Sequence, residues 1–299
     1  MMLRSGYLAK EGLLKNLLEE LQDPKALVLD HLVLSTLPYQ ELYFKQNGWK
    51  EVETFAFSSI KEAARLLRAK GKYWAFYPTT LYRRGLLIQE NLAKAPVKPL
   101  LFPTSLPSTS YGGWTLLDEK TLVFSKETTS PFPHGEVLFE EDKTLPSRAY
   151  LKLYEAFMQV GSLPQKGEKC LEIGASPGSW SSILATLGAQ LTCCDRAPLA
   201  PSLKRFSNLR FVQGDAFKLT PQEVGPIDWL FSDLICYPDK LFDYIRLWLE
   251  SGLCKNFICT LKFQEGISLK ALENFEKIPG SRLLHLFHNK HEITWMKTS

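Results

Sequence analysis

The sequence has few of the features that mark membrane, secreted or unstructured proteins. Its 299 residues contain no run of about 18 consecutive apolar residues, which excludes a membrane-spanning helix. The first 21 residues, MMLRSGYLAKEGLLKNLLEEL, are too rich in charge for a signal peptide, so we expect a cytoplasmic protein. Apolar residues make up 45% of the chain and charged residues 23%, which excludes disordered, collagenous and coiled-coil classes.

Cysteine is absent before residue 170, and no CxxC pair occurs after it. We therefore expect buried, reduced thiols rather than disulfides or a zinc site. Three histidines, His285, His288 and His291, recur at every third position. The segment RLLHLFHNKHEITWM is typical of two strands around a tight turn at Asn289 and Lys290, in which these side chains would not converge, so we expect no metal.

The net charge of +4 is small, but the basic residues are unevenly distributed. Nine basic residues and only two acidic ones lie between Lys61 and Lys98, interleaved with aromatic residues. Cations bind phosphates and aromatic faces stack on unpaired bases, so the charge cluster predicts contact with RNA. We expect Trp74 and Phe76, in contrast, to alternate into a core. The candidate RNA-binding residues here are Arg65, Arg68, Arg83 and Arg84.

The length predicts two domains. Prolines at 96, 99, 103 and 107 interrupt the segment from Ala95 to Tyr111 and favour an extended linker. We expect a small α+β domain over residues 1–95, a linker and connecting segment over 96–145, and a second domain over 146–299. Within the first domain, one helix is expected from Lys10 to Leu21. Another should begin after Ser59, which forms a capping box with Glu62, and stop at Gly71, before the strand KYWAFYP.

From Cys170 onward, short apolar runs alternate with helical patterns. Five such runs, CLEIGA, QLTCCD, LRFVQGD, IDWLFSDL and NFICTLKF, predict parallel strands of an open sheet covered by helices on both faces. The C-terminal segment adds two strands, of which the last is expected to pair antiparallel. The fold class is therefore α/β: a Rossmann-like domain with a mostly parallel, seven-stranded sheet.

A glycine-containing loop follows the first of these strands and opens a helix. Gly174 and Gly178 allow a tight turn and close approach of a nucleotide-like cofactor. The loop is neither a Walker loop nor a GxGxxG fingerprint, and its acidic Glu172 disfavours a pyrophosphate. A positively charged cofactor fits better. The candidate cofactor-binding residues of this segment are Glu172, Gly174, Ala175, Ser176, Pro177, Gly178 and Trp180.

Three further acidic residues stand at the ends of the next three strands: Asp195, Asp215 and Asp233. S-adenosylmethionine carries a sulfonium, an amino group and a ribose diol, all of which suit carboxylates at this edge of a sheet. Asp215 taken alone is equally well interpreted as a turn or capping residue. Four acids at four consecutive strand ends together predict S-adenosylmethionine as the cofactor.

The segment SRAYLKLYEAF, which precedes the first strand, resembles the S-R-x-x-x-K-L-x-E signature of FtsJ-type ribose 2′-O-methyltransferases. That resemblance implies a class I methyltransferase fold and a catalytic tetrad at Lys152, Asp233, Lys262 and Glu292. From Tyr111 onward, the order and spacing of the motifs EIGASPGSW, CCDRAPLAPSL, GDAFKL and DWLFSDLICYPDK are similar to the RlmM-type branch, which methylates a cytidine ribose of 23S ribosomal RNA. The resemblance implies 23S ribosomal RNA as partner, a THUMP-like RNA-binding region before the linker, and an RNA contact at Arg148.

The tetrad also has a chemical reason independent of the resemblance. A ribose hydroxyl needs a base to take its proton during methyl transfer, and a lysine serves only where its pKa falls below about 10.4. A neighbouring ammonium group lowers such a pKa. We expect Lys262 to be the base, Lys152 the neighbouring cation, Asp233 to orient Lys262, and Glu292 to hold Lys152 or the ribose. Two alternatives stay open: another RNA target, such as transfer RNA or a messenger cap, and a non-catalytic RNA-binding protein. The oligomeric state is not predicted.

Overall fold

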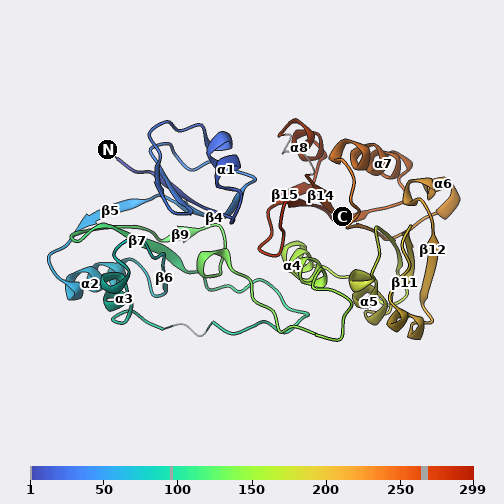
Figure 1. Ribbon diagram of the computed structural model, residues 1–299, viewed down its shortest axis with the longest axis horizontal. Coiled ribbons are helices and arrows are strands. Elements are labelled where there is room, and N and C mark those ends of the chain that lie inside the picture. The colour runs from blue at the N-terminus through green and yellow to red at the C-terminus, as the bar shows by residue number, and fades with distance from the viewer. Residues whose placement is uncertain (1, 95–96, 264–268) are drawn as a thin grey trace. The chain divides into compact units, whose positions relative to one another are not determined.

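The computed structural model describes residues 2–94, 97–263 and 269–299 and divides into two compact units (Figure 1). The N-terminal unit extends to Leu100 and includes Leu106–Leu138. The C-terminal unit comprises Leu101–Ser105 and Phe139–Ser299. Ala95 and Pro96, where the predicted linker begins, lie outside the described residues.

Two sheets form the N-terminal unit. The first has the order β2-β3-β1-β4-β9 and is antiparallel throughout: β1 (Ser5–Ala9), β2 (Leu27–Leu29), β3 (Leu32–Ser35), β4 (Lys45–Lys50), β9 (Glu127–Thr128). The second has the order β5-β8-β7-β6, in which only β6 and β7 run parallel: β5 (Glu53–Ala56), β6 (Trp74–Phe76), β7 (Gly112–Asp118), β8 (Thr121–Ser125). Three helices accompany the sheets: α1 (Leu14–Leu21), α2 (Ile60–Lys70), α3 (Tyr82–Gln89).

The local signals of this unit have the predicted effect. Ser59 is the N-cap of α2, where its side chain accepts the amide of Glu62, and Gly71 ends the helix. Trp74 and Phe76 are buried beneath α2 and α3, as their alternation predicts. The helix expected from Lys10 begins only at Leu14, because the chain leaves β1 just before it.

The domain boundary differs from the expectation. Residues 106–138, predicted as part of a connecting segment, contribute β7, β8 and β9 to the N-terminal sheets. β8 is buried on both faces: Leu122 and Phe124 pack toward the helices, and Val123 packs with the first sheet. Leu101–Ser105 belongs to the C-terminal unit, where the Phe102 ring stacks on Tyr154 with centroids 3.8 Å apart. The proline-rich run therefore leaves the first unit and returns to it, which a composition break alone does not indicate.

The C-terminal unit contains the predicted α/β sheet of seven strands, in the order β12-β11-β10-β13-β14-β16-β15. Five strands are parallel: β10 (Lys169–Ile173), β11 (Gln190–Asp195), β12 (Leu209–Gln213), β13 (Trp229–Ser232), β14 (Asn256–Lys262). The last strand, β16 (Glu292–Lys297), pairs antiparallel with both β14 and β15 (Ser281–Leu284), as expected for its end of the chain. The connection between β15 and β16 is a loop over residues 285–291 rather than the tight turn predicted at Asn289 and Lys290.

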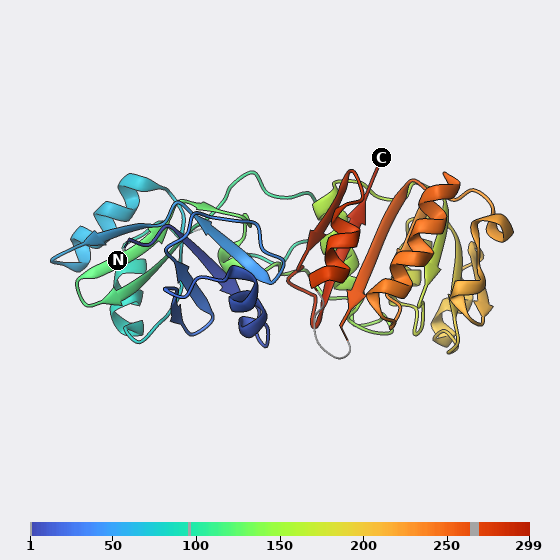
Figure 2. The ribbon, with the colours of Figure 1, turned by 90° about the horizontal axis from the view of Figure 1, so that it is seen from above.

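Helices cover both faces of this sheet. α4 (Tyr150–Val160) and α5 (Ser179–Thr186) lie on one face, and α6 (Pro221–Val224), α7 (Pro238–Ser251) and α8 (Leu269–Glu276) lie on the other (Figure 1). Figure 2 shows the orange α7 and the red α8 side by side along the strands. Short 3-10 helices complete the chain: η1 (Pro133–Gly135), η2 (Pro201–Arg205), η3 (Ala216–Lys218). Five of the six cysteines are buried, the exception being the half-buried Cys236.

No helix within the described ranges is both long and apolar enough to cross a membrane.

Candidate active site

Four charged side chains converge at the carboxyl edge of the C-terminal sheet. The Lys152 ammonium lies 2.9 Å from Oδ1 of Asp233 and 2.7 Å from Oε1 of Glu292. The Lys262 ammonium lies 3.1 Å from the same Asp233 oxygen and 3.9 Å from Oε2 of Glu292. Because both ammonium groups contact one oxygen, they are at most about 6 Å apart. The structure therefore brings together all four residues of the predicted tetrad.

Neighbouring strands explain this convergence. Asp233 directly follows β13, and Lys262 ends the adjacent parallel strand β14, so both stand at the same edge of the sheet. Glu292 opens β16, whose antiparallel register places it opposite Lys262. Lys152 reaches the edge from α4, and the Thr260 hydroxyl donates to Asp233 Oδ1 at 2.7 Å. The side chain of Asp233 is thus held by three donors.

The two charge pairs determine which groups stay ionised. Burial opposes ionisation of Asp233, but the charges of Lys152 and Lys262 lower its pKa below the ordinary value. Burial also disfavours the charged form of Lys152, yet the two carboxylates and their hydrogen bonds raise its pKa. Lys152 therefore stays an ammonium group. The side chain of Lys262 is 20% exposed against 9% for Lys152, so Lys262 is the lysine that a substrate reaches more readily.

A fifth residue, Glu155, holds this cluster and was not singled out from the sequence. It lies one turn after Lys152 on α4 and is only 3% exposed. Its carboxylate accepts the backbone amides of Phe287 at 2.8 Å and His288 at 3.1 Å, in the loop that leads to Glu292. The signal available in the sequence was its place as the last residue of the S-R-x-x-x-K-L-x-E signature.

The loop after β10 has the geometry that its glycines suggested. Gly174 has φ +73°, and a Cβ there would lie 2.5 Å from Cα of Leu234. Gly178 has φ +108° and lies against Leu203. Side chains at either position would be strained, so the loop can approach the segment after β13 only with glycine. The amide of Ser176 donates to Oδ2 of Asp195 at 2.9 Å, which fixes the loop against β11.

A cavity of about 490 Å³ opens beside this loop and reaches the tetrad. Of the predicted cofactor-binding residues, six line it: Gly174, Ser176, Pro177, Asp195, Asp215 and Asp233. Lys262 lines it as well, so the cavity and the tetrad share two residues. Sequence analysis missed the aromatic and cationic part of the wall, which comes from Phe217, Tyr237 and Lys240. Phe217 lies two residues after Asp215, and Tyr237 and Lys240 lie four and seven residues after Asp233; this proximity in the sequence was the available signal.

The other four predicted cofactor residues, Glu172, Ala175, Gly178 and Trp180, do not line the cavity. Glu172 is 1% exposed and accepts the Ser181 hydroxyl at 2.6 Å, and burial raises its pKa to about 8. The indole of Trp180 donates to the carbonyl of Ala149 at 2.8 Å. Glu172, on β10, and Trp180, on α5, point into the interior of the unit, a direction that the motif alone does not reveal.

Asp215 is a capping residue, as one of the two interpretations of the sequence predicts. Its carboxylate caps η3 by accepting the amide of Phe217 at 3.2 Å, and it also lines the cavity. Capping and its ion pair with Arg196, at 3.2 Å, lower its pKa below the ordinary value. It therefore presents an ionised carboxylate to the cavity that Asp195 and Lys262 also line.

The predicted RNA-binding arginines lie on two helices and one loop. Arg65 and Arg68 on α2 and Arg83 on α3 are exposed. Arg84 is half-buried, with its guanidinium 5.5 Å from the centre of the Phe57 ring. Arg148, just before α4, is exposed and pairs with Glu141 at 2.7 Å.

In the part of the chain that the structure describes, no group of three or more His, Cys, Asp or Glu side chains is placed to hold a metal ion.

The C-terminal unit is similar to known methyltransferases. The family described as FtsJ-like methyltransferase matches residues 145–272. Among similar curated proteins are two named Ribosomal RNA large subunit methyltransferase M. The one from Azoarcus sp. is 27% identical over 67% of this chain and 56% of its own length. The one from Idiomarina loihiensis is 27% identical over 78% of this chain and 65% of its own length. The chain thus spans about half to two thirds of the curated relatives it matches.

Among the solved structures that match is one of a putative ribosomal RNA methyltransferase from Plasmodium falciparum. It is 19% identical to this chain, with a TM-score of 0.37, and the match covers 51% of this chain and 97% of that chain.

Proposed function

We propose that this chain transfers a methyl group from S-adenosylmethionine to a ribose 2′-hydroxyl of ribosomal RNA in the cytoplasm. Residues 145–272 match the FtsJ-like methyltransferase family, and similar curated proteins are named Ribosomal RNA large subunit methyltransferase M. The observation that carries the proposal is the Lys152–Asp233–Lys262–Glu292 cluster at the mouth of a cavity lined by carboxylates.

The residues of the cavity fit S-adenosylmethionine. Asp195 and Asp215 are acceptors suited to ribose hydroxyls and an exocyclic amine, and the glycine at 174 leaves room for close approach of a ligand. Asp233, which belongs to the tetrad, also lines the cavity, so a sulfonium and an amino group bound there would meet a negative charge. When bound, S-adenosylmethionine supplies an electrophilic methyl group.

The tetrad supplies the proton acceptor and its alignment. Lys262 takes the proton of the ribose hydroxyl, because it is the more exposed lysine and lines the cavity. Oδ1 of Asp233 lies 3.1 Å from the Lys262 nitrogen and orients it, so the lone pair of a neutral Lys262 amine has a defined direction. Lys152 remains charged between two carboxylates and keeps a positive potential beside the developing ammonium group. Glu292 fixes Lys152 and lies near enough to Lys262 to orient it or a ribose hydroxyl.

The proposed target is a cytidine of 23S ribosomal RNA; the names of the curated relatives support a large-subunit ribosomal RNA as the substrate. The direct test incubates the purified protein with methyl-tritiated S-adenosylmethionine and ribosomal RNA, then digests the RNA to nucleosides for mass spectrometry. We expect label in 2′-O-methylcytidine for the wild type and none for Lys262→Met. Lys255→Met, an exposed lysine just before β14, is the matched control.

Transfer to transfer RNA or capped messenger instead would overturn the substrate assignment. Absence of transfer to any RNA, with S-adenosylmethionine bound, would support the non-catalytic RNA-binding alternative.

A further inference from the structure

A second cavity lies outside the active site, within the N-terminal unit. It has a volume of about 810 Å³ and opens between the two sheets of that unit. Leu8 on β1 and Gln46 on β4 line it from the first sheet, and β6 lines it from the second. α3 covers it along one helical face, formed by Tyr82, Leu86 and Gln89. Pockets of this volume hold drug-sized ligands.

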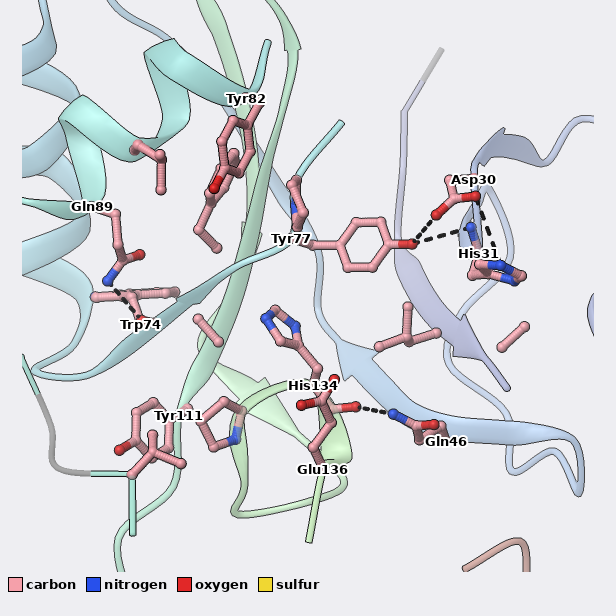
Figure 3. A pocket seen from close by; sticks show the side chains of 18 of the residues that line it. Asp30, His31, Gln46, Trp74, Tyr77, Tyr82, Gln89, Tyr111, His134 and Glu136 are labelled. Carbon is pink, nitrogen blue, oxygen red and sulfur yellow. Dashed lines mark hydrogen bonds and ion pairs between the residues drawn. The ribbon is translucent and has the colours of Figure 1, made fainter. Parts of the chain in front are cut away.

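Flat rings dominate its wall. Figure 3 shows Tyr82, Tyr77, Trp74 and Tyr111 around the opening, with the His134 ring below Tyr77. Tyr82 is 53% exposed, although its ring has apolar neighbours on the same helix. The Tyr77 and His134 rings meet edge to face, with centroids 5.9 Å apart. Planar walls of this kind favour a planar, aromatic occupant that can stack on them.

The polar groups at the cavity are mostly acceptors. Three carboxylates, from Glu11, Asp30 and Glu136, line it against a single lysine, Lys94. The Tyr77 hydroxyl donates to Asp30 at 2.9 Å and accepts the amide of His31 at 3.2 Å, which fixes the Asp30 carboxylate in place (Figure 3). This excess of negative charge disfavours a phosphate inside the cavity and favours a neutral occupant with N–H donors.

One of the two histidines that line the cavity, His31, has unsatisfied hydrogen-bonding capacity. Nδ1 of His31 is buried and has no hydrogen-bond partner among the described residues. Burial lowers the pKa of His134, so its ring is neutral at pH 7. His134 and Asp30 also adopt left-handed backbone angles, each with φ of 55°, which non-glycine residues rarely do. Strained residues of this kind cluster where a fold shapes a ligand site.

We propose that this cavity binds one unpaired nucleobase that carries an exocyclic amino group, with its phosphates outside the cavity near Lys94. The amino group donates to the carboxylates, and the base stacks on the tyrosine rings. The proposal deepens the proposed function, because it names how the N-terminal unit takes hold of the RNA that the C-terminal unit methylates. The base bound here is a recognition base in addition to the one whose ribose is modified.

The test uses the full chain and a short, unstructured RNA with one 2-aminopurine, an amino-bearing base whose fluorescence falls when it stacks. We expect the wild type to quench this probe at saturation. Tyr82→Ala and Tyr111→Ala should each weaken quenching and raise the Kd roughly 5- to 150-fold, the range for losing one stacked base. Leu87→Ala is the matched control, because Leu87 lies on the same helix, is 51% exposed and does not line the cavity.

Two further probes test the chemistry of the site. The same RNA with unsubstituted purine lacks the amino group and should bind more weakly to the wild type, but Glu136→Gln should lose that preference. An RNA abasic at the probe position should bind about as weakly as the 2-aminopurine RNA binds to Tyr82→Ala. Equal binding of the abasic and 2-aminopurine RNAs, or equal quenching by Tyr82→Ala, Tyr111→Ala and Leu87→Ala, would overturn the proposal.

Lys262→Met separates this proposal from the proposed function. It should quench the 2-aminopurine probe like the wild type while transferring no methyl group. Methyl transfer by the wild type without quenching would remove the base site and leave the enzyme. Quenching that depends on Tyr82 in a wild-type protein that transfers no methyl group would keep the base site and remove the enzyme.

Discussion

Lys152 and Glu292 are 140 positions apart in the chain, yet Nζ of one lies 2.7 Å from Oε1 of the other in a buried ion pair. The pair joins α4 to the first residue of β16 at the edge of the sheet. Its position beside Asp233 means that Lys152 contacts two carboxylates at once. Lys262 is the more exposed of the two lysines and lines the cavity.

Replacing Lys262 with methionine removes the proposed base and keeps most of the side-chain volume. We expect a loss of about 10²- to 10⁴-fold in the rate of methyl transfer, the usual contribution of a general base. Binding of S-adenosylmethionine, measured by calorimetry, should change little because the carboxylates at Asp195 and Asp215 remain. A rate within threefold of that of Lys255→Met would exclude Lys262 as the base.

Replacing Lys152 with methionine leaves buried carboxylates at Asp233 and Glu292 with one cation fewer. We expect a loss of about 3–5 kcal/mol in the free energy of unfolding at pH 7, as for one partner removed from a buried ion pair. Urea denaturation would measure it, with Lys143→Met, an exposed lysine, as the control. A loss below 1 kcal/mol would mean that the site is better solvated than its 9% exposure indicates.

The same four side chains make the free energy of unfolding depend on pH at both the acid and the alkaline end. The folded-state pKa of Asp233 is lowered, so its stabilising contribution is present above the unfolded value near 3.9 and is lost as pH falls through the folded pKa. The folded-state pKa of Lys152 is raised, so its contribution is present below about 10.4 and is lost as pH rises through the folded pKa. We expect Asp233→Asn to flatten the acid limb of a plot of unfolding free energy against pH. An unchanged acid limb would assign that limb to other carboxyl groups.

Glu172 should show the opposite behaviour. Burial raises its pKa to about 8, above the unfolded value near 4.3, so the folded protein binds the proton more tightly. Its presence therefore costs stability progressively as pH rises from about 4.3 to 8. We expect Glu172→Gln to raise the free energy of unfolding relative to the wild type at pH 8 but not at pH 4, by an amount on the order of 1–3 kcal/mol. Glu250→Gln, exposed on α7, should show no such trend.

Glu155 is expected to act through the loop before Glu292. Glu155→Gln keeps one acceptor for the amides of Phe287 and His288, and Glu155→Ala keeps none. We expect hydrogen exchange at these two amides to accelerate in the order wild type, Gln, Ala, and methyl transfer to fall in the same order by about tenfold in total, since hydrogen bonds to a charged group contribute about 1.5–3 kcal/mol. Accelerated exchange with an unchanged rate would show that the position of Glu292 does not depend on this loop.

Much of the C-terminal unit could be predicted locally. Apolar runs bounded by glycine and charged residues predict β10 to β14. Asp195 ends β11, Asp215 and Asp233 follow β12 and β13, and Lys262 ends β14, so these side chains lie at the one edge where parallel strands finish. The resemblance to FtsJ-type enzymes adds the four tetrad residues, which the structure brings together. The same motif misplaced Glu172 and Trp180, because a strand's alternation does not say which face the chain beyond it will cover.

The sequence by itself determined the elements whose signals are short-range: the cap at Ser59, the buried alternation of Trp74 and Phe76, and the turn at Gly174. Only the tertiary structure decided that β16 inserts between β14 and β15 and so sets Glu292 opposite Lys262. It also decided that residues 106–138 return to the N-terminal sheets and help enclose a cavity there. The physical reason is that periodicity records which face of an element is buried, whereas strand order and register depend on partners far along the chain.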